Sequence, residues 1–294
     1  MLLRRVITAL ALLVMLIPAL LATQPWVWAG FSLIFVVLAC WEWMRLLEPS
    51  RSQSAVFFAL LAMGISGLAG LALEQRFWLE PMVIPVSVVA CLAWCCLVPR
   101  SLSGFIHEAW IQAWLGWLFL LAAWLALLAL HQQELTLLFS SLALVWVADV
   151  AAYFTGRYFG RRKLAPHISP GKTQEGAVGA CFFVAVIGTL GALLGGSVWA
   201  DALPRRWTLL LSTQMPEVLA VLIMLALLMF LVILSIVGDL YESQLKRLAG
   251  VKDSSKLLPG HGGILDRIDA LLPTLPAVVL IDRWLHWLTQ GARG

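Results

Sequence analysis

The residues best suited to chemistry lie in 239–269, where acidic and basic side chains alternate around a glycine-rich turn. If the first part of this segment is helical, one helix face carries Asp239, Glu242, Ser243 and Lys246. Carboxylate oxygens are the hard donors that Mg²⁺ prefers, and Lys and Arg side chains suit phosphate groups. The pattern therefore predicts a site for metal-assisted phosphate transfer.

An alternative interpretation treats the same residues as solvated charges on a cytoplasmic loop, as the positive-inside rule favours. It accounts for the five Lys and Arg residues of the segment. It does not account for the five acidic residues interleaved with them, or for the Gly-His-Gly-Gly turn at 260–263. Asp266 and Asp269 also share a helix face, at spacing i, i+3.

A second polar group begins inside an apolar run. Asp149 is an ionisable residue within that run, and Tyr153 is its i+4 neighbour on the same helix face. Downstream, Ser-Pro-Gly-Lys-Thr at 169–173 contains Gly-Lys-Thr but lacks the spacing of a P-loop, and no strand is predicted before it. The sequence therefore does not predict a Walker motif.

The local chemistry of 169–173 still suits phosphate. Lys172 supplies a cation, and Ser169 and Thr173 supply hydroxyl donors. The same residues are typical of a helix start, with Ser169 as the cap and Pro170 in the first turn. The two interpretations are compatible, because a helix N-terminus attracts phosphate.

Composition indicates which elements position these residues. Of 294 residues, 62% are hydrophobic and 12% are charged, against about 25% charged in an average soluble protein. This excludes an ordinary soluble enzyme, and the continuous apolar runs exclude a β-barrel. The sequence predicts an all-α polytopic transmembrane helical bundle, forming one integral membrane domain over 1–294 with long polar loops at 156–175 and 239–269.

Runs of about 20 apolar residues predict membrane spans. Eight to nine are expected, and the candidates are 6–22, 26–47, 55–73, 81–98, 110–130, 135–155, 176–199, 215–238 and 270–290. The distribution of Lys and Arg favours a cytoplasmic N-terminus and places both polar loops in the cytoplasm, although Arg205 and Arg206 run against the bias. Glu42, between two Trp residues and near Arg45, is expected to reach the membrane interface rather than a cavity.

The downstream segment resembles a known family. It reads Ser-x-Leu-Lys-Arg-x4-Lys-Asp-x-Ser-x2-Leu-Pro-x-His-Gly-Gly-Ile-x-Asp-Arg-Ile-Asp from Ser243 to Asp269. This resembles the phosphatidate cytidylyltransferase (CDP-diacylglycerol synthase) signature at every specified position. The motif around Asp149 and the motif at 169–176 are also similar to the family, so the motifs cover 142–269. The N-terminal spans resemble it in apolar character and around Glu42.

The resemblance implies a reaction in which CTP and phosphatidic acid give CDP-diacylglycerol and pyrophosphate with a divalent metal. It also implies a homodimer in the bacterial inner membrane. Membrane lipids are expected as further partners, and nucleic acid is not. Mg²⁺ is the expected cofactor, with room for a second cation. A CTP-dependent membrane lipid kinase is the alternative function. A transporter that uses Asp149 is disfavoured, because the acidic residues cluster in loops.

On this basis we assign expected roles. Asp239 and Asp266 are the expected metal ligands, with Asp149 and Asp253 as second choices. Phosphates are expected to be held by the cations Lys172, Lys246, Arg247 and Arg267. His261 is expected to donate to the leaving pyrophosphate. Further substrate contacts are expected from Ser169, Thr173, Ser243, Lys252, Gly262 and Gly263.

Overall fold

The computed structural model describes residues 14–22, 24–47, 76–104, 108–260 and 262–291. Its long helices are α2 (Pro25–Leu47), α4 (Arg76–Leu102), α5 (Ala109–Gln133), α6 (Leu135–Phe159), α7 (Gln174–Leu194), α9 (Glu217–Leu248) and α11 (Leu271–Gly291). Shorter elements are the 3₁₀ turn η1 (Ser197–Trp199), α8 (Leu203–Ser212) and α10 (Leu265–Ile268). Two short strands, β1 (Lys163–Ala165) and β2 (Ser169–Thr173), form an antiparallel hairpin.

Six helices of the described ranges are long and apolar enough to cross a membrane, namely α2, α4, α5, α6, α7 and α9. The predicted all-α polytopic architecture is therefore confirmed, with a small hairpin added to it. The count of eight to nine spans is not confirmed. Candidate span 55–73 and the first eight residues of candidate span 6–22 lie outside the described residues. Candidate span 270–290 forms α11, whose second half contains Asp282 and Arg283.

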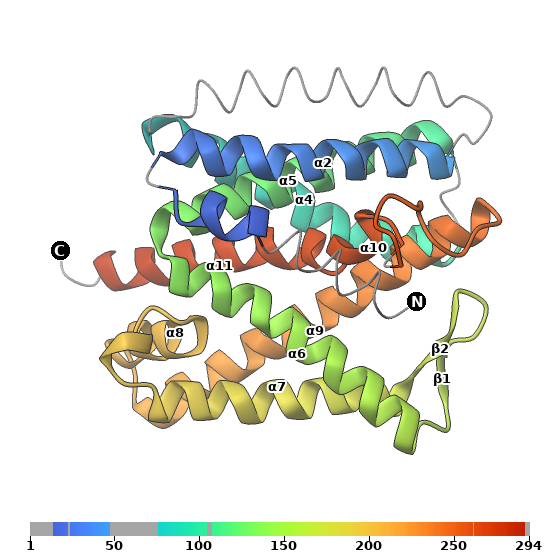
Figure 1. Cartoon of the computed structure of the whole chain (residues 1–294). Helices are drawn as coiled ribbons and strands as arrows, with labels where there is room; N and C mark the ends of the chain where they lie inside the picture. Colours follow the sequence, from blue (N-terminus) through green and yellow to red (C-terminus); the bar gives the residue numbers. More distant parts are fainter. Residues whose placement is uncertain (1–13, 23, 48–75, 105–107, 261, 292–294) are drawn as a thin grey trace.

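The helices form two groups around α11 (Figure 1). Helices α2 and α4 pack on α5, and α6 packs chiefly on α7. Helix α11 contacts α4, α5, α8 and α9, so it joins the two groups. The hairpin and α10 lie toward one end of the molecule in Figure 1, and α8 lies toward the other.

Helix α9 is longer than a membrane requires. Its 32 residues correspond to about 48 Å at ~1.5 Å per residue, whereas the hydrocarbon core is about 30 Å thick. The surplus turns carry Asp239, Glu242, Ser243 and Lys246. The expected helix in this part of 239–269 is therefore confirmed, and it is a continuation of the preceding apolar helix rather than part of a loop.

Aromatic packing fixes the polar end of α9 against the N-terminal helices. Trp43, Trp94, Phe119 and Tyr241 are fully buried and come from α2, α4, α5 and α9. The rings of Trp94 and Phe119 stack with centroids 4.1 Å apart, and Tyr241 meets Trp94 edge to face at 5.6 Å. This arrangement holds the charged turns of α9 in one position relative to α2.

The segment 169–173 adopts a different structure from the expected helix start. Its residues form β2, and α7 begins only at Gln174. The N-cap is Thr173, whose side chain accepts a hydrogen bond from the Gly176 N–H at 3.1 Å, so the expectation of Ser169 as cap is wrong. The physical reason is pairing with β1, which keeps 169–173 extended until Thr173 can cap α7.

Candidate active site

A cavity of about 550 Å³ opens where α6, α7, α9, α10 and the hairpin meet. Its polar and charged lining residues are Asp149, Tyr153, Arg157, Ser169, Lys172, Thr173, Ser235, Asp239, Lys246, Asp266, Arg267 and Asp269. The structure thus brings together the two polar groups that the sequence carries in 149–176 and 239–269. Clustered acids and bases in one cavity can bind phosphates together with a cation.

Close contact between α6 and α7 forms one wall of the cavity. A Cβ atom on Gly156 would lie 2.8 Å from the Thr173 hydroxyl, and one on Gly176 would lie 2.8 Å from the Ala152 carbonyl oxygen. Glycine at both positions therefore allows the two helix backbones to approach. The same packing leaves Asp149 on the cavity side of α6.

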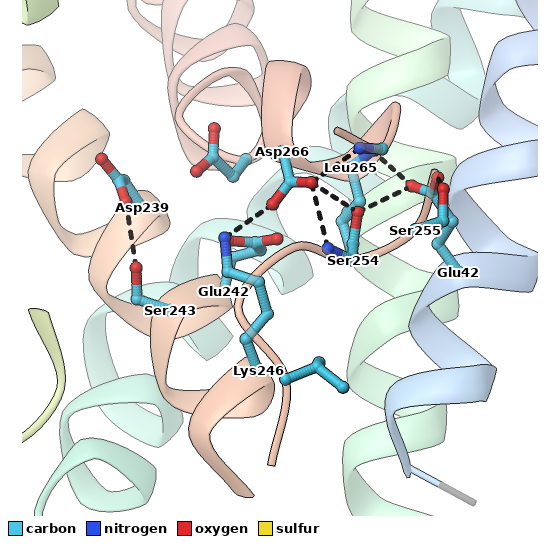
Figure 2. A network of polar contacts seen from close by, with 12 residues as sticks. Glu42, Asp239, Glu242, Ser243, Lys246, Ser254, Ser255, Leu265 and Asp266 are labelled. Carbon is cyan, nitrogen blue, oxygen red and sulfur yellow. Dashed lines mark hydrogen bonds and ion pairs between the residues drawn. The ribbon is translucent and has the colours of Figure 1, made fainter. Parts of the chain in front are cut away.

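The hairpin contributes a lysine to the opposite wall. Lys172 Nζ lies 2.6 Å from Asp239 Oδ2, and both side chains are partly exposed to the cavity. Ser243 Oγ donates to the other oxygen of Asp239 at 3.3 Å. The ion pair joins β2 to α9 across the mouth of the site (Figure 2 shows the α9 side).

Lys246 occupies the centre of the second ion-pair group. Its ammonium contacts the buried carboxylate of Glu242 and lies 2.6 Å from Asp266 Oδ1. Burial acts to raise the pKa of Asp266. The hydrogen bonds from Lys246 and from the Gly263 N–H outweigh it and hold that pKa below the usual range of an aspartate. Asp266 therefore carries its negative charge beside the cavity.

Asp269 has the opposite electrostatic environment. Burial raises the pKa of Asp269 to about 8, and repulsion from Asp239 adds to the rise. Two carboxylates that repel one another in a cavity are the donor set that a hard cation stabilises, so these residues fit Mg²⁺. Within the described part of the chain, no three acidic, His or Cys side chains are close enough to hold a metal ion by themselves.

The other expected site residues that the structure describes lie outside the cavity lining. Arg247 donates to the Ile168 and Val251 carbonyl oxygens, which places it against the hairpin. Lys252 and Asp253 lie in the exposed connection between α9 and α10. Gly262 and Gly263 shape that connection, and the expected role of His261 falls outside the described residues. Gly262 has φ +85°, a conformation that favours glycine.

Glu42 is placed where the sequence did not predict it. Its side chain is fully buried, so the expectation that it reaches the membrane interface is wrong. Its carboxylate accepts hydrogen bonds from both Ser254 and Ser255 and from the N–H groups of Ile264 and Leu265 (Figure 2). The reason is that residues 254–255 and 264–265 dock onto α2, which covers Glu42 with protein.

Three further acidic residues lie at or beside the site without an expected role, namely Glu42, Glu242 and Asp269. The sequence carries a signal for Glu242 and Asp269, because they are helix-face neighbours of Asp239 and Asp266 at spacing i+3. It carries one for Glu42 too, because an acidic residue inside an apolar run is a functional-site hypothesis by default.

Comparison with known proteins identifies the family of this chain. The profile of the cytidylyltransferase family matches residues 3–284. A phosphatidate cytidylyltransferase of Pseudomonas aeruginosa is 37% identical over 285 residues, which cover 94% of this chain and 95% of the relative. The protein of that name from Haemophilus influenzae is 30% identical over 94% of this chain and 96% of its own length. The one from Bacillus subtilis is 40% identical over 50% of this chain and 47% of its own length. Because the profile spans nearly all of the sequence and two relatives align along almost their full lengths, the chain belongs to the cytidylyltransferase family.

Proposed function

We propose that this protein transfers the cytidylyl group of CTP to phosphatidic acid, giving CDP-diacylglycerol and pyrophosphate for phospholipid synthesis. The observation that carries the proposal is the cavity in which Lys172 pairs with Asp239 and Lys246 pairs with Asp266. Both substrates are anionic, and this cavity offers lysines for their phosphates. The names of the full-length relatives support the same reaction.

The location of the cavity suits one lipid and one water-soluble substrate. Three of the elements that line it, α6, α7 and α9, are long and apolar enough to cross a membrane. Along α7, the outward side chains Phe182, Ile187 and Leu190 are exposed, as expected of a lipid-facing surface. A diacylglycerol moiety can remain among lipids while its phosphate enters the cavity.

In the proposed mechanism, a phosphate oxygen of phosphatidic acid attacks the α-phosphorus of CTP, and pyrophosphate leaves in line. Phosphatidic acid is already anionic near neutral pH, so no strong general base is needed. The protein instead positions the reactants and offsets their repulsion. We assign this task to Lys172, Lys246 and Arg267, which line the cavity. Arg247 belongs to the margin of the site, beside the hairpin.

Mg²⁺ is the proposed cofactor. Asp239 and Asp266 would hold it together with phosphate oxygens of CTP, since Mg²⁺ is usually bound by one or two carboxylates plus substrate phosphates. The ion would supply charge neutralisation at the phosphates. Asp149 lines the cavity and is the better supported second ligand, whereas Asp253 does not line it. Asp269 is a further candidate for a second cation.

The proposed location is the bacterial inner membrane, with the N-terminus and the catalytic residues in the cytoplasm, where CTP is found. The bacterial origin of the relatives and the Lys and Arg residues of the hairpin support this. Assembly as a homodimer stays a prediction from the family resemblance.

The test is to incubate the purified protein in detergent with phosphatidic acid, α-³²P-labelled CTP and Mg²⁺. We expect label in the lipid fraction, and loss of that label in Asp266→Ala with folding retained. Asp201→Ala is the matched control, because Asp201 does not line the cavity and forms a partly exposed pair with Arg206 of α8, which lies toward the other end of the molecule. Label only in free CDP, with phosphorylation of a lipid alcohol that is added to the assay, would instead indicate the kinase. Wild-type turnover in folded Asp266→Ala would refute the metal-ligand assignment.

A further inference from the structure

Glu42 lies beside the cavity residues without lining the cavity. In Figure 2, Asp266 lies between Lys246 on one side and Ser254 and Glu42 on the other. Asp266 Oδ1 contacts Lys246 at 2.6 Å, while Oδ2 accepts hydrogen bonds from the connection before α10. One oxygen of Asp266 thus contacts Lys246, which lines the cavity, and the other is held by the backbone.

The short helix α10 has no cap of its own. Its N-cap residue is Ile264, which makes no side-chain capping hydrogen bond. The first N–H groups of a helix need an acceptor, and burial without one is costly. Glu42 supplies this acceptor from α2, because Oε1 accepts from the Ile264 N–H at 3.0 Å and Oε2 accepts from the Leu265 N–H at 2.6 Å.

Two serines extend the contact from α10 to the connection before it. Ser255 donates to Glu42 Oε1, and Ser254 Oγ lies 3.1 Å from Glu42 Oε2 and 2.9 Å from Asp266 Oδ2. A hydroxyl has one proton, so Ser254 donates to one of these carboxylates at a time. Its backbone N–H donates to Asp266 as well, at 3.0 Å. The same serine therefore contacts both Glu42 and Asp266.

Glycine makes room for this arrangement. A Cβ atom on Gly263 would lie 1.9 Å from the Ser254 hydroxyl and 2.5 Å from Glu42 Oε1. No side chain fits between the connection and α2 at this point. The Gly263 N–H also donates to Asp266 Oδ2 at 2.7 Å.

We propose that Glu42 is a positioning residue, which docks α10 and residues 254–255 onto α2 and so fixes the Asp266 carboxylate in its place beside Lys246. The expected effect on catalysis rests on the proposed function. The inference extends the site to α2, which precedes the family motifs at 142–269.

Glu42→Gln is the informative substitution. Each carboxylate oxygen of Glu42 lies within hydrogen-bond distance of one serine hydroxyl and accepts from one backbone N–H at the start of α10. A hydroxyl can rotate, but a backbone N–H cannot. Whichever way the amide is oriented, its NH₂ group faces either the Ile264 N–H or the Leu265 N–H, and that hydrogen bond is lost.

We expect Glu42→Gln to lower kcat by about 10–100-fold and to raise the Mg²⁺ concentration needed for half-maximal activity by a similar factor. This is the usual effect of losing a residue that orients a metal ligand. The KM for phosphatidic acid should change little. Independently of turnover, hydrogen–deuterium exchange should become faster in peptides that contain Ile264 and Leu265. Ser255→Ala removes one donor and should shift each quantity in the same direction by a smaller factor.

Asp282→Asn is the matched control. Asp282 on α11 is also fully buried, and it accepts a hydrogen bond from Arg206 Nε of α8 at 2.7 Å. Helix α8 lies toward the other end of the molecule (Figure 1). It should lower the melting temperature without changing the Mg²⁺ requirement or the exchange near α10. If Glu42→Gln behaves like this control, the proposed positioning role is wrong. If Glu42→Gln does not fold, wild-type Mg²⁺ dependence and exchange in Ser255→Ala lead to the same conclusion.

The two proposals fail in different ways. If wild-type protein forms no CDP-lipid, the proposed function is wrong, while the exchange measurement still tests the docking of α10. If wild-type protein is active and Glu42→Gln retains its kcat, Mg²⁺ requirement and exchange pattern, only the role of Glu42 is refuted.

Discussion

The pairing of Lys172 with Asp239 illustrates how single residues serve this site. Each side chain offsets the charge of its partner, at an Nζ to Oδ2 distance of 2.6 Å. In the proposed function, an entering triphosphate would compete for the lysine, and a cation would compete for the aspartate. Substrate binding would then separate the pair, and Lys246 and Asp266 form a second ion pair of the same kind.

This leads to a prediction for Lys172. Lys172→Ala should raise the KM for CTP by about 10–100-fold, because a hydrogen bond to a charged group contributes ~1.5–3 kcal/mol. Steady-state kinetics with varied CTP would measure it. Lys163→Ala is the control, since Lys163 is exposed on the same hairpin and does not line the cavity. Equal KM values in the two variants would remove Lys172 from the proposed nucleotide site.

At the scale of elements, helix packing determines the shape of the site. Glycines bring α6 and α7 into contact beside the cavity, and the surplus length of α9 carries the acidic residues past the apolar region. The hairpin then adds Lys172 from the side. Each of these elements forms part of the cavity wall. A change in the packing of α6 on α7 would therefore alter the shape of the cavity even if no charged residue is substituted.

Gly176→Ala tests this packing. The added methyl group would lie 2.8 Å from the Ala152 carbonyl oxygen, so α6 and α7 must separate. Overpacking of this kind costs about 1–3 kcal/mol, and we expect a lower melting temperature in a thermal unfolding assay. Gly30→Ala on α2 is the control, because its methyl group meets no atom within 4 Å. It should leave the melting temperature unchanged or raise it. The opposite ranking would contradict the packing argument.

Over the whole molecule, charge is distributed unevenly between the two ends. The end with the hairpin has the exposed cations Arg161, Arg162 and Lys163. At the other end, Arg206 pairs with Asp201 and with the buried Asp282. Arg205 and Arg206 run against the predicted orientation, but the charge of Arg206 is compensated within the fold.

The predicted orientation can be measured with trypsin. In inverted inner-membrane vesicles, trypsin should cleave at 161–163, because an exposed hairpin with Arg and Lys residues would face the medium. In intact spheroplasts the same peptide bonds should be protected. Mass spectrometry of the fragments gives the cleavage positions. Cleavage at 161–163 in spheroplasts and protection in inverted vesicles would reverse the proposed topology.

The sequence alone was sufficient for the helical membrane class, the helical face with Asp239 and Lys246, and the family resemblance. These features depend on composition, on helical periodicity and on spacing within one segment, all of which are local. Tertiary structure decided the rest. Strand pairing changed the expected helix start at Ser169 into β2, and helix packing brought Lys172 to Asp239. Glu42 meets Ser254 across 212 positions of sequence, a contact that no local pattern specifies because it depends on how α2 and α9 pack.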